Sequence, residues 1–342
     1  MKVAMKNKLP TISVVTATYN SEKTLEKCLK LVREQNYPQN IVEIILGDGG
    51  SSDGTFDIAK KHKARVVSIP KEKQHAEYNR GVAYNNAKNE LVLILDHDNF
   101  LPYKNWLKDM VQPFLENSDM VAATTLHYHY DKKYKLMDRY FALFGSSEPL
   151  PYFLKKDDRM SQTVTTWKGH GKVFNKGKYF LVEFGKEARK FPSIGTNGTL
   201  MSRKIVNKYA DTRPEHHYPI DVLFDVVKNS KYNKFGFVKN SIIHLTHSNG
   251  FWEFMKRRKW FVEHYHFQDF SKRRWSVVMP GDEFGVFLYV IYSLSFLLPF
   301  IDSLIGFTKI RDVAWFVHPL MCFSTTIVYG WVTVKEEIKK WM

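Results

Sequence analysis

Two carboxylates separated by one residue, Asp96 and Asp98, follow a run of five apolar residues at 91–95. Such a run predicts a strand that is buried on both faces. Two acids at the end of a buried strand repel each other and are costly to desolvate unless a cation lies beside them. A divalent metal that carries a diphosphate would satisfy both acids, because such ions bind hard oxygen ligands together with substrate phosphates. The alternative is a pair of solvated loop acids, since Asp-x-Asp is common by chance.

Two further polar clusters stand at the ends of predicted strands. A strand at 11–17 runs into the polar residues 18–20, and a strand at 42–46 leads to Asp48 and a glycine-rich turn. Strand and helix patterns alternate from residue 11 to residue 95, which predicts an α/β fold with a doubly wound, mostly parallel sheet. Ligands of such sheets bind at the carboxyl ends of the strands, so we expect the three clusters to share one edge.

The composition sets bounds on the class of protein. The 342 residues are enough for one sizeable α/β domain with an appendage, and a formal net charge of +16 favours polyanionic partners such as nucleic acid, anionic lipid headgroups or phosphorylated substrates. The two cysteines, Cys28 and Cys322, lie far apart without metal-ligand spacing, so neither a disulfide framework nor a zinc site is expected. Residues 1–9 contain no long apolar stretch, and no signal peptide is expected.

Four segments of the chain are similar to the family 2 glycosyltransferases with the GT-A nucleotide-sugar fold. They are residues 14–20, 48–55, 79–81 and 96–99, and the resemblance extends over about residues 10–250. It implies the transfer of a sugar from a nucleotide diphosphate-sugar donor. It also implies a donor-binding set of side chains, which comprises Thr18, Tyr19, Asn20, Asp48, Asn79, Arg80, Asp96 and Asn197.

The resemblance implies separate roles within this set. Thr18 and Tyr19 flank the base, and Asp48 accepts a hydrogen bond from it. Asp96 lies near the ribose and the metal, and Asp98 is the main ligand of a Mg²⁺ or Mn²⁺ ion on the diphosphate. The chemistry of the residues agrees with these roles, because a carboxylate accepts a ring N–H and a metal neutralises a leaving diphosphate.

Two positions depart from the family pattern. Phe100 stands where some relatives carry a coordinating side chain, and Tyr78 stands before Asn79 where some relatives have an arginine. Metal occupancy and diphosphate contacts are therefore less well specified than the fold. Arg80 could serve the phosphates instead, or it could be an ordinary arginine on a helix surface.

Two segments further along the chain resemble the acceptor side of the family. The turn at Asn197 is similar to an Asn-Gly turn that lines the acceptor side of the donor sugar, although a simple type I′ turn has the same sequence. Relatives place an acidic catalytic base at the start of a helix, and Asp221 matches this position best. Asp225, one turn later, is the second candidate. An acid at a helix start could equally be a structural cap that complements the helix dipole.

Other segments carry weaker signals. His244 and His247 follow the strand predicted at 237–244 and could reach the diphosphate or the metal, although most histidines near strand ends are simply hydrogen-bonded. We place an acceptor-side insertion at 127–189. The charged residues at 155–159 within it are expected to lie mostly on solvated surface.

The last third of the chain changes character. Aromatic and basic residues alternate from 251 to 275, which is typical of helices in a membrane interface or of nucleic-acid binding. Uncharged apolar runs follow at 284–301 and 313–334, and each approaches the ~20 residues that cross a bilayer. We therefore predict C-terminal amphipathic helices followed by two hydrophobic membrane helices. A buried helical hairpin in a soluble domain and a hairpin that crosses incompletely are the alternatives.

The resemblance and these patterns together imply three regions. A GT-A catalytic domain occupies 1–250, basic-aromatic interfacial helices occupy 251–280, and a membrane hairpin or two transmembrane segments occupy 281–342. The predicted location is the cell membrane, with the catalytic domain facing the cytoplasm. Membrane lipids are therefore expected partners.

The predicted function is the inverting, metal-dependent transfer of a sugar to a lipid-linked acceptor, either a polyprenyl phosphate or a lipid-linked oligosaccharide. A polysaccharide synthase is the alternative enzyme, although two apolar segments are too few for a polymer channel. A basic nucleic-acid-binding protein would explain the charge but not the strand-end acids. No nucleic-acid partner is therefore expected.

Overall fold

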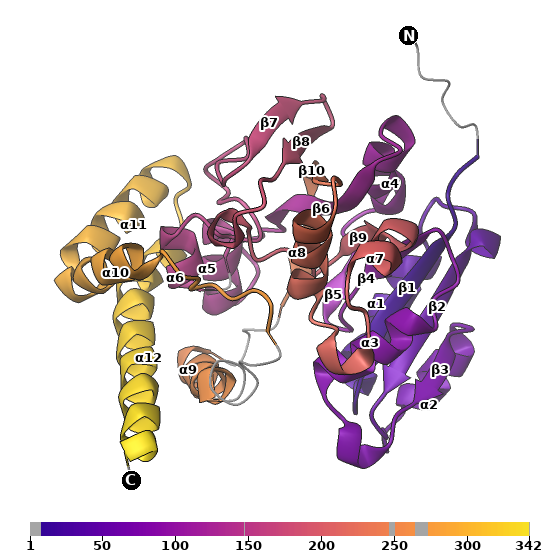
Figure 1. The fold of residues 1–342 in the computed structure, drawn as a ribbon, viewed down its shortest axis with the longest axis horizontal. Coiled ribbons are helices and arrows are strands. Elements are labelled where there is room, and N and C mark those ends of the chain that lie inside the picture. Colours follow the sequence, from indigo (N-terminus) through magenta and orange to yellow (C-terminus); the bar gives the residue numbers. More distant parts are fainter. Residues whose placement is uncertain (1–7, 147, 246–249, 264–272, 342) are drawn as a thin grey trace. The chain divides into compact units, whose positions relative to one another are not determined.

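The chain divides into two compact units. Unit 1 comprises Met1–His129 and His170–His244, and unit 2 comprises Tyr130–Gly169 and Leu245–Met342. Residues 130–169 therefore group with the C-terminal part of the chain, whereas the domain boundary predicted at residue 250 places them in the catalytic domain. The computed structural model, whose elements are labelled in Figure 1, describes residues 8–146, 148–245, 250–263 and 273–341.

Unit 1 is built on one ten-stranded mixed sheet. Its strands are β1 (Ile12–Thr18), β2 (Val42–Asp48), β3 (Arg65–Ser68), β4 (Leu91–Ile94), β5 (Asn99–Phe100), β6 (Met120–Tyr128), β7 (Lys172–Asn175), β8 (Tyr179–Glu183), β9 (Thr199–Ser202) and β10 (Lys234–His244). Their order is β3-β2-β1-β4-β9-β6-β10-β8-β7, and β5 pairs with β10 outside this path.

One half of the sheet is parallel, as predicted. β1 runs parallel to β2 and β4, and β2 runs parallel to β3, as the alternation of strand and helix patterns predicts. β9 instead lies antiparallel between β4 and β6, and β8, β7 and β5 are antiparallel to their neighbours. The expectation of a mostly parallel sheet is thus corrected to a mixed sheet, because the second half of the chain inserts antiparallel strands into it.

Amphipathic helices complete unit 1. In α1 (Glu22–Arg33), the residues Leu25, Cys28, Leu29 and Val32 are buried and recur at the three- and four-residue spacing of one helix face. Each fully buried aliphatic side chain contributes roughly 1.5–3 kcal/mol, so such faces hold the helices on the sheet. The other helices are α2 (Thr55–Lys61), α3 (Ala76–Asn85), α4 (Trp106–Glu116), α7 (Arg203–Tyr209) and α8 (Pro219–Asn229), with 3₁₀ turns η1 (Gln39–Ile41), η2 (Lys71–Lys73), η3 (Ala188–Lys190) and η4 (Pro214–His216).

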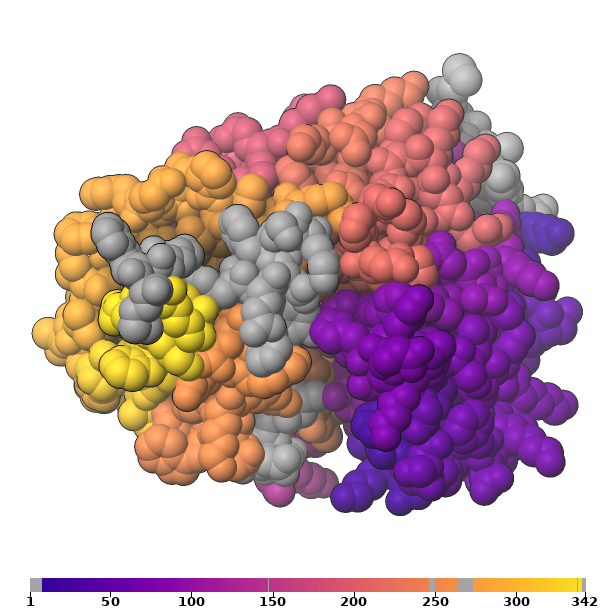
Figure 2. All heavy atoms as spheres, turned by 60° about the horizontal axis from the view of Figure 1, so that its bottom comes forward, coloured from indigo at the N-terminus to yellow at the C-terminus, as the bar shows by residue number. Residues whose placement is uncertain are grey.

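Unit 2 is helical and has an aromatic core. Its elements are α5 (Leu136–Phe144), α6 (Pro149–Phe153), α9 (Phe251–Phe261), α10 (Glu283–Ser295), α11 (Leu297–Lys309), the 3₁₀ turn η7 (Val313–Val317) and α12 (His318–Trp341). Tyr140, Phe141 and Phe144 of α5 pack with Phe254 of α9 and with Trp315 of η7. Helix α9 also lies beside α12, as the orange and yellow surfaces in Figure 2 show.

The first apolar run does not form one membrane helix. It folds as α10 and α11, which are bent by 80° at a break around Phe296. In the described part of the chain, Val313–Glu336 is the only unbroken helical segment long and apolar enough to cross a membrane. A second span exists only if the bent pair counts as one. The prediction of two hydrophobic membrane helices is thus corrected to one candidate helix and one bent pair.

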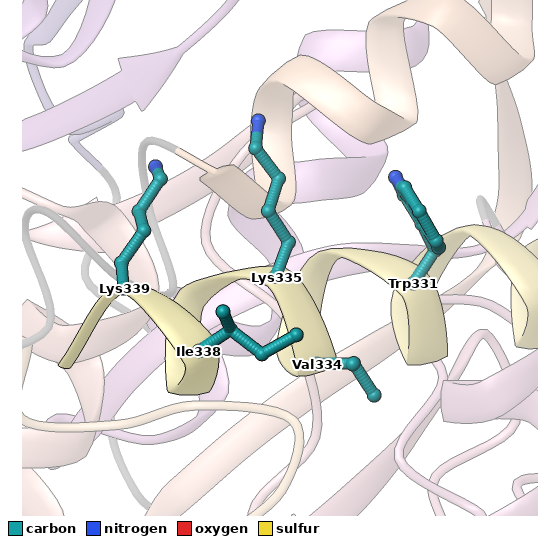
Figure 3. A pocket seen from close by; sticks show the side chains of 5 residues that line it. All are labelled: Trp331, Val334, Lys335, Ile338 and Lys339. Atoms are coloured by element: carbon teal, nitrogen blue, oxygen red, sulfur yellow. The ribbon is translucent and has the colours of Figure 1, made fainter. Parts of the chain in front are cut away.

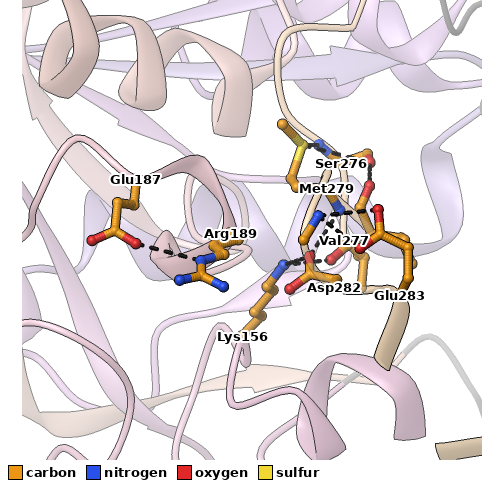
Figure 4. Close-up of polar contacts among 10 residues, drawn as sticks. Lys156, Glu187, Arg189, Ser276, Val277, Met279, Asp282 and Glu283 are labelled. Carbon is orange, nitrogen blue, oxygen red and sulfur yellow. Dashed lines mark hydrogen bonds and ion pairs between the residues drawn. The ribbon is translucent and has the colours of Figure 1, made fainter. Parts of the chain in front are cut away.

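The charged residues at 156–159 are buried rather than solvated. Lys156 Nζ donates to the Val277 carbonyl at 2.8 Å and pairs with the Asp282 carboxylate (Figure 4). The same carboxylate accepts from the Met279 backbone N–H at 2.8 Å. The expectation of solvated charges is therefore wrong for 156–159, and for Lys156 partners inside the protein take the place of water.

Asp282→Asn should destabilise unit 2 by on the order of 3 kcal/mol, because the buried Lys156 ammonium loses its counter-charge. Glu283→Gln is the matched control, since Glu283 lies at the surface and its bond to the Gly281 N–H survives the change. Its effect should stay within about 0.5 kcal/mol. Thermal or urea unfolding measures both variants, and equal stability would contradict the buried pair.

Candidate active site

Two neighbouring strands end side by side at one edge of the sheet. Thr18 of β1 is in register with Asp48 of β2, and its Oγ1 donates to Asp48 Oδ2 at 2.8 Å. Asp48 is fully buried and also accepts from the N–H groups of Gly50 and Ser51 and from Ser51 Oγ, at 3.0, 2.8 and 2.6 Å. A carboxylate offers about four acceptor positions, so protein donors fill those of Asp48. Asp48 thus organises the glycine-rich loop, and its contact with a base stays a prediction.

Asn20 ties the same loop to the end of β1. Its backbone takes a left-handed φ of 48°, its N–H donates to Ser51 Oγ at 2.8 Å, and its Oδ1 accepts from the Ser52 N–H at 2.8 Å. The neighbouring residue Tyr19 is 45% exposed. An exposed aromatic ring on a fixed backbone can stack on a planar base. The structure gives Asn20 a positioning role and leaves the Tyr19 ring accessible to a ligand.

Helix α3 brings Asn79 and Arg80 against the strand ends. A Cβ atom on Gly47 of β2 would lie 2.0 Å from the Asn79 carbonyl oxygen, so glycine permits this close approach. Arg80 is buried, and its guanidinium donates to Asp96 Oδ1 at 2.8 Å and to the Glu77 carboxylate. The interpretation of Arg80 as a surface arginine is therefore wrong, because its guanidinium lies against the strand-end acid.

The charge of Asp96 is set by its neighbours. Burial by itself raises the pKa of the Asp96 carboxyl, but the Arg80 guanidinium outweighs burial and holds that pKa below its ordinary value. The imidazoles of His97 and His244 add a smaller lowering of the same pKa. Asp96 is therefore ionised at neutral pH, as a metal or ribose ligand must be to act as a strong acceptor.

Asn99 fixes the turn that carries both acids. It is fully buried, its N–H donates to the Asp96 carbonyl at 2.9 Å, and its Nδ2 donates to Asp98 Oδ1 at 3.3 Å. Strand β5 pairs with the end of β10, which puts Asn99 in register with His244. His244 thus lies beside the acidic turn, as the sequence suggests, whereas His247 falls outside the described residues.

Strand β9 brings the Asn197 turn beside the end of β4. The N–H of Gly198 donates to the Ile94 carbonyl at 2.8 Å. Asn197 has a φ of 53°, as a type I′ turn requires, and its Nδ2 donates to the Tyr128 hydroxyl at 3.0 Å. The ring centroids of Tyr128 and His244 lie 5.5 Å apart. Tyr128 is absent from the predicted site, and its one signal in the sequence is an aromatic side chain near the start of the insertion placed at 127–189.

The first turn of α8 holds Asp221, and the loop before β9 packs against it. Gly195 in that loop has a φ of 141°, and a Cβ atom there would lie 2.7 Å from the Pro219 carbonyl carbon. Asp221 is fully buried, whereas Asp225, one turn later, accepts from the Asp211 N–H at 3.2 Å. Asp225 therefore anchors a neighbouring segment, and the role of Asp221 as a base stays a prediction.

Asp96 and Asp98 are better suited to a metal ion that arrives bound to a substrate than to a metal ion that the protein holds by itself. Across the described ranges, no group of three or more His, Cys, Asp or Glu side chains is arranged to hold a metal ion. Mg²⁺ and Mn²⁺ can instead bind one or two carboxylates and take their other ligands from substrate phosphates and water. The ionised Asp96 and the partly exposed Asp98 offer such a pair of oxygen donors.

The family model described as Glycosyl transferase family 2 matches residues 13–180. Glycosyltransferase AglE of Haloferax volcanii is 31% identical over 108 residues, which cover 30% of this chain and 35% of AglE. The dolichyl N-acetyl-alpha-D-glucosaminyl phosphate 3-beta-D-2,3-diacetamido-2,3-dideoxy-beta-D-glucuronosyltransferase of Methanococcus voltae is 32% identical over 110 residues, which cover 30% of this chain and 33% of that protein. The similarity thus spans about a third of the length of these relatives.

Solved structures give a weaker likeness. The mannosyltransferase PcManGT from Pyrobaculum calidifontis, solved in complex with GDP-Man and Mn²⁺, aligns with a TM-score of 0.48 and 13% identity over 96% of this chain and 90% of that chain. The structure of S. aureus TarS aligns with a TM-score of 0.48 and 15% identity over 94% of this chain and 54% of that chain.

Gly195→Ala should lower the free energy of unfolding of unit 1 by about 1–3 kcal/mol, because the new Cβ meets the start of α8 from a strained backbone. Gly185→Ala is the control, since a Cβ atom there has no neighbour within 4 Å. The control should be neutral or stabilising by up to about 1 kcal/mol. Thermal unfolding compares the two variants, and matching melting temperatures would show that the loop does not pack on α8 as described.

Proposed function

Because the chain belongs to glycosyl transferase family 2 through its residues 13–180, we propose that it transfers a sugar from a nucleotide diphosphate-sugar to a lipid-linked acceptor. One observation carries the proposal. The ionised Asp96 and its neighbour Asp98 follow β4, next to β1, and the Thr18–Asp48 pair stands at the end of β1 and β2. In a parallel sheet the carboxyl ends of adjacent strands form the ligand-binding edge.

The donor is assigned to this edge. Tyr19 would stack on the base, and the loop that Asp48 organises would receive the polar edge of the base. Asp96 and Asp98 would hold a Mg²⁺ or Mn²⁺ ion on the diphosphate. Such an ion, when bound, offsets the negative charge that develops on the departing diphosphate. Arg80 would keep Asp96 ionised and oriented for this purpose.

The acceptor side is assigned to Asn197 and Asp221. In an inverting transfer the acceptor oxygen bonds to the anomeric carbon from the face opposite the departing diphosphate, whose bond to that carbon breaks. A hydroxyl acceptor must lose its proton in this step, and Asp221 would take it as the general base. Asn197 would line the donor sugar on the acceptor side. A phosphate acceptor is already ionised and needs no base.

We place the reaction at the surface of the cell membrane, with unit 1 facing the cytoplasm. The exposed apolar side chains of α10, α11 and α12 favour a lipid environment, and the net charge of +16 suits anionic headgroups. The name of the Methanococcus voltae relative contains a dolichyl-linked sugar phosphate, which is the kind of lipid-linked acceptor proposed here.

A glycosyltransferase that modifies a polymer is the second candidate. TarS of Staphylococcus aureus, which is 32% identical over 101 residues covering 28% of this chain and 18% of TarS, is named for a poly(ribitol-phosphate) acceptor. A water-soluble polymer would leave the exposed apolar helices without a role. The lipid-linked acceptor is therefore preferred.

Asp98→Asn should abolish both transfer and metal-dependent nucleotide binding, because it removes charge from the metal site without changing volume. Asp57→Asn, at an exposed acid of α2, is the matched control and should keep normal activity. Both variants should unfold at the temperature of the unmodified protein. Transfer assays with Mn²⁺ and with a chelator test the assignment, and near-normal activity of Asp98→Asn in the presence of chelator would contradict it.

Asp221→Asn should lower kcat by about 10²–10⁴-fold with little change in donor affinity, provided that the acceptor is a sugar hydroxyl. With a lipid phosphate acceptor the same change should be mild. Asp225→Asn is the control and should keep kcat, because its amide oxygen can still accept from the Asp211 N–H. A large loss of donor affinity in Asp221→Asn would exclude the base assignment, since it would place Asp221 in the nucleotide pocket.

A further inference from the structure

Most of the large apolar side chains exposed in the described chain belong to the last three helices of unit 2. They are Phe284, Phe287, Leu288, Ile291 and Leu294 of α10, Leu297, Leu298, Phe300, Ile301, Leu304 and Ile305 of α11, and Leu320, Phe323, Ile327, Trp331, Val334 and Ile338 of α12. Soluble monomers rarely expose so much contiguous apolar surface. Yet α10 and α11 have 13 residues each, so each is ~20 Å long, which is less than the ~30 Å hydrocarbon core of a bilayer.

Side-chain hydrogen bonds hold the bend between α10 and α11 closed. The Tyr292 hydroxyl of α10 donates to Asp302 Oδ2 of α11 at 2.6 Å and contacts His318 Nε2 of α12 at 3.0 Å. Tyr292 and Asp302 are ten residues apart in sequence, so in one straight helix they would lie ~15 Å apart along the axis. Ser303 Oγ also donates to the Trp315 carbonyl at 2.8 Å. The bent pair is therefore a folded corner with an internal polar network, and not a distorted span.

A charged helix lies along α12 and opposes its crossing of a membrane. Phe254 of α9 shares a buried cluster with Met321 of α12. The Glu148 carboxylate accepts from both Arg258 of α9 and the Tyr329 hydroxyl of α12. The exposed residues of α9 include Glu253, Lys256, Arg257 and Lys259. If α12 crossed the bilayer, these charges would enter hydrocarbon, at a cost of roughly 2.5–3.5 kcal/mol for each Lys or Arg at the centre.

We propose that unit 2 is a monotopic anchor, whose apolar helices enter one leaflet of an anionic bilayer and do not cross it. This proposal rests on the membrane attachment proposed above. The anionic headgroups are chosen because exposed basic residues accompany the apolar surface, namely Lys256, Arg257 and Lys259 on α9, Lys309 at the end of α11, Arg311 just beyond it, and Lys339 on α12. Basic side chains next to an apolar face are typical of helices that lie in a membrane interface.

The end of α12 has the composition of such an interface. A shallow hollow there is lined by Trp331, Val334, Lys335, Ile338 and Lys339, and Figure 3 shows these side chains on consecutive turns of the helix. Lys335 Nζ also donates to Glu263 Oε1, just beyond α9, at 3.2 Å. Lysine stems and a tryptophan ring can lie against lipid while their polar ends stay in the headgroup layer. This end of α12 therefore fits the same side of the membrane as α9.

Accessibility of single cysteines tests the proposal in sealed vesicles with the cytoplasmic face outward, made from cells that express the whole chain. Lys61→Cys marks unit 1, Lys256→Cys marks α9, Lys339→Cys marks the end of α12, and Phe296→Cys marks the corner. The native Cys28 and Cys322 are buried, and the unmodified chain measures their background labelling. A membrane-impermeant maleimide is added before, or during, opening of the vesicles by freezing and thawing without detergent.

A monotopic anchor predicts that the cysteines at 61, 256 and 339 are labelled in sealed vesicles. The cysteine at 296 should stay unlabelled even in opened vesicles and react only after detergent. Labelling of residue 339 only after opening, or not at all, would show that α12 crosses or is embedded, and labelling of residue 296 on opening would show that the corner reaches the far side. Either result overturns the proposal. If the chain does not float with the vesicles, the membrane attachment itself is wrong, and the monotopic anchor fails with it.

Discussion

The candidate site depends on the ion pair between the buried Arg80 and the partly buried Asp96. Taking the Arg80 guanidinium from water into the protein costs several kcal/mol, so it is tolerated at the sheet edge because the Asp96 carboxylate lies beside it. Helix α3 supplies the guanidinium and the turn after β4 supplies the carboxylate, which joins two elements through one contact. The pair keeps Asp96 ionised beside Asp98. An ionised acidic turn at the end of a buried strand is what a metal-bound diphosphate requires.

The sequence predicts well the edge of the sheet to which the donor is assigned, because the carboxyl ends of parallel strands meet at one edge whatever the length and composition of each strand. Thr18 and Asp48 do end in register. The insertion of β9 between β4 and β6 is not predictable, because pairing between distant segments leaves no local pattern. That pairing brings Asn197 to Tyr128, and the contact is the part of the site that sequence reasoning misses.

The burial of charged residues is predicted wrongly where their partners lie far away in the sequence. Arg80 and Lys156 look like surface charges in a local window, which does not contain Asp96 or Asp282. The bend between α10 and α11 is not predicted for a similar reason. The mean hydropathy of the apolar run is little changed by the single acid Asp302. An acid inside an apolar run needs a partner, and that requirement was the available signal for the bend.

Calorimetric titration of the whole chain with Mn²⁺, with a nucleoside diphosphate, and with both together tests the central claim most directly. A site of two carboxylates that is completed by substrate phosphates should bind Mn²⁺ weakly alone and far more tightly with UDP, GDP or another matching diphosphate. By thermodynamic linkage, Mn²⁺ should increase the affinity of the chain for the nucleotide by the same factor. Equal nucleotide affinity with Mn²⁺ and with chelator would contradict the claim that Asp96 and Asp98 form a metal-diphosphate site.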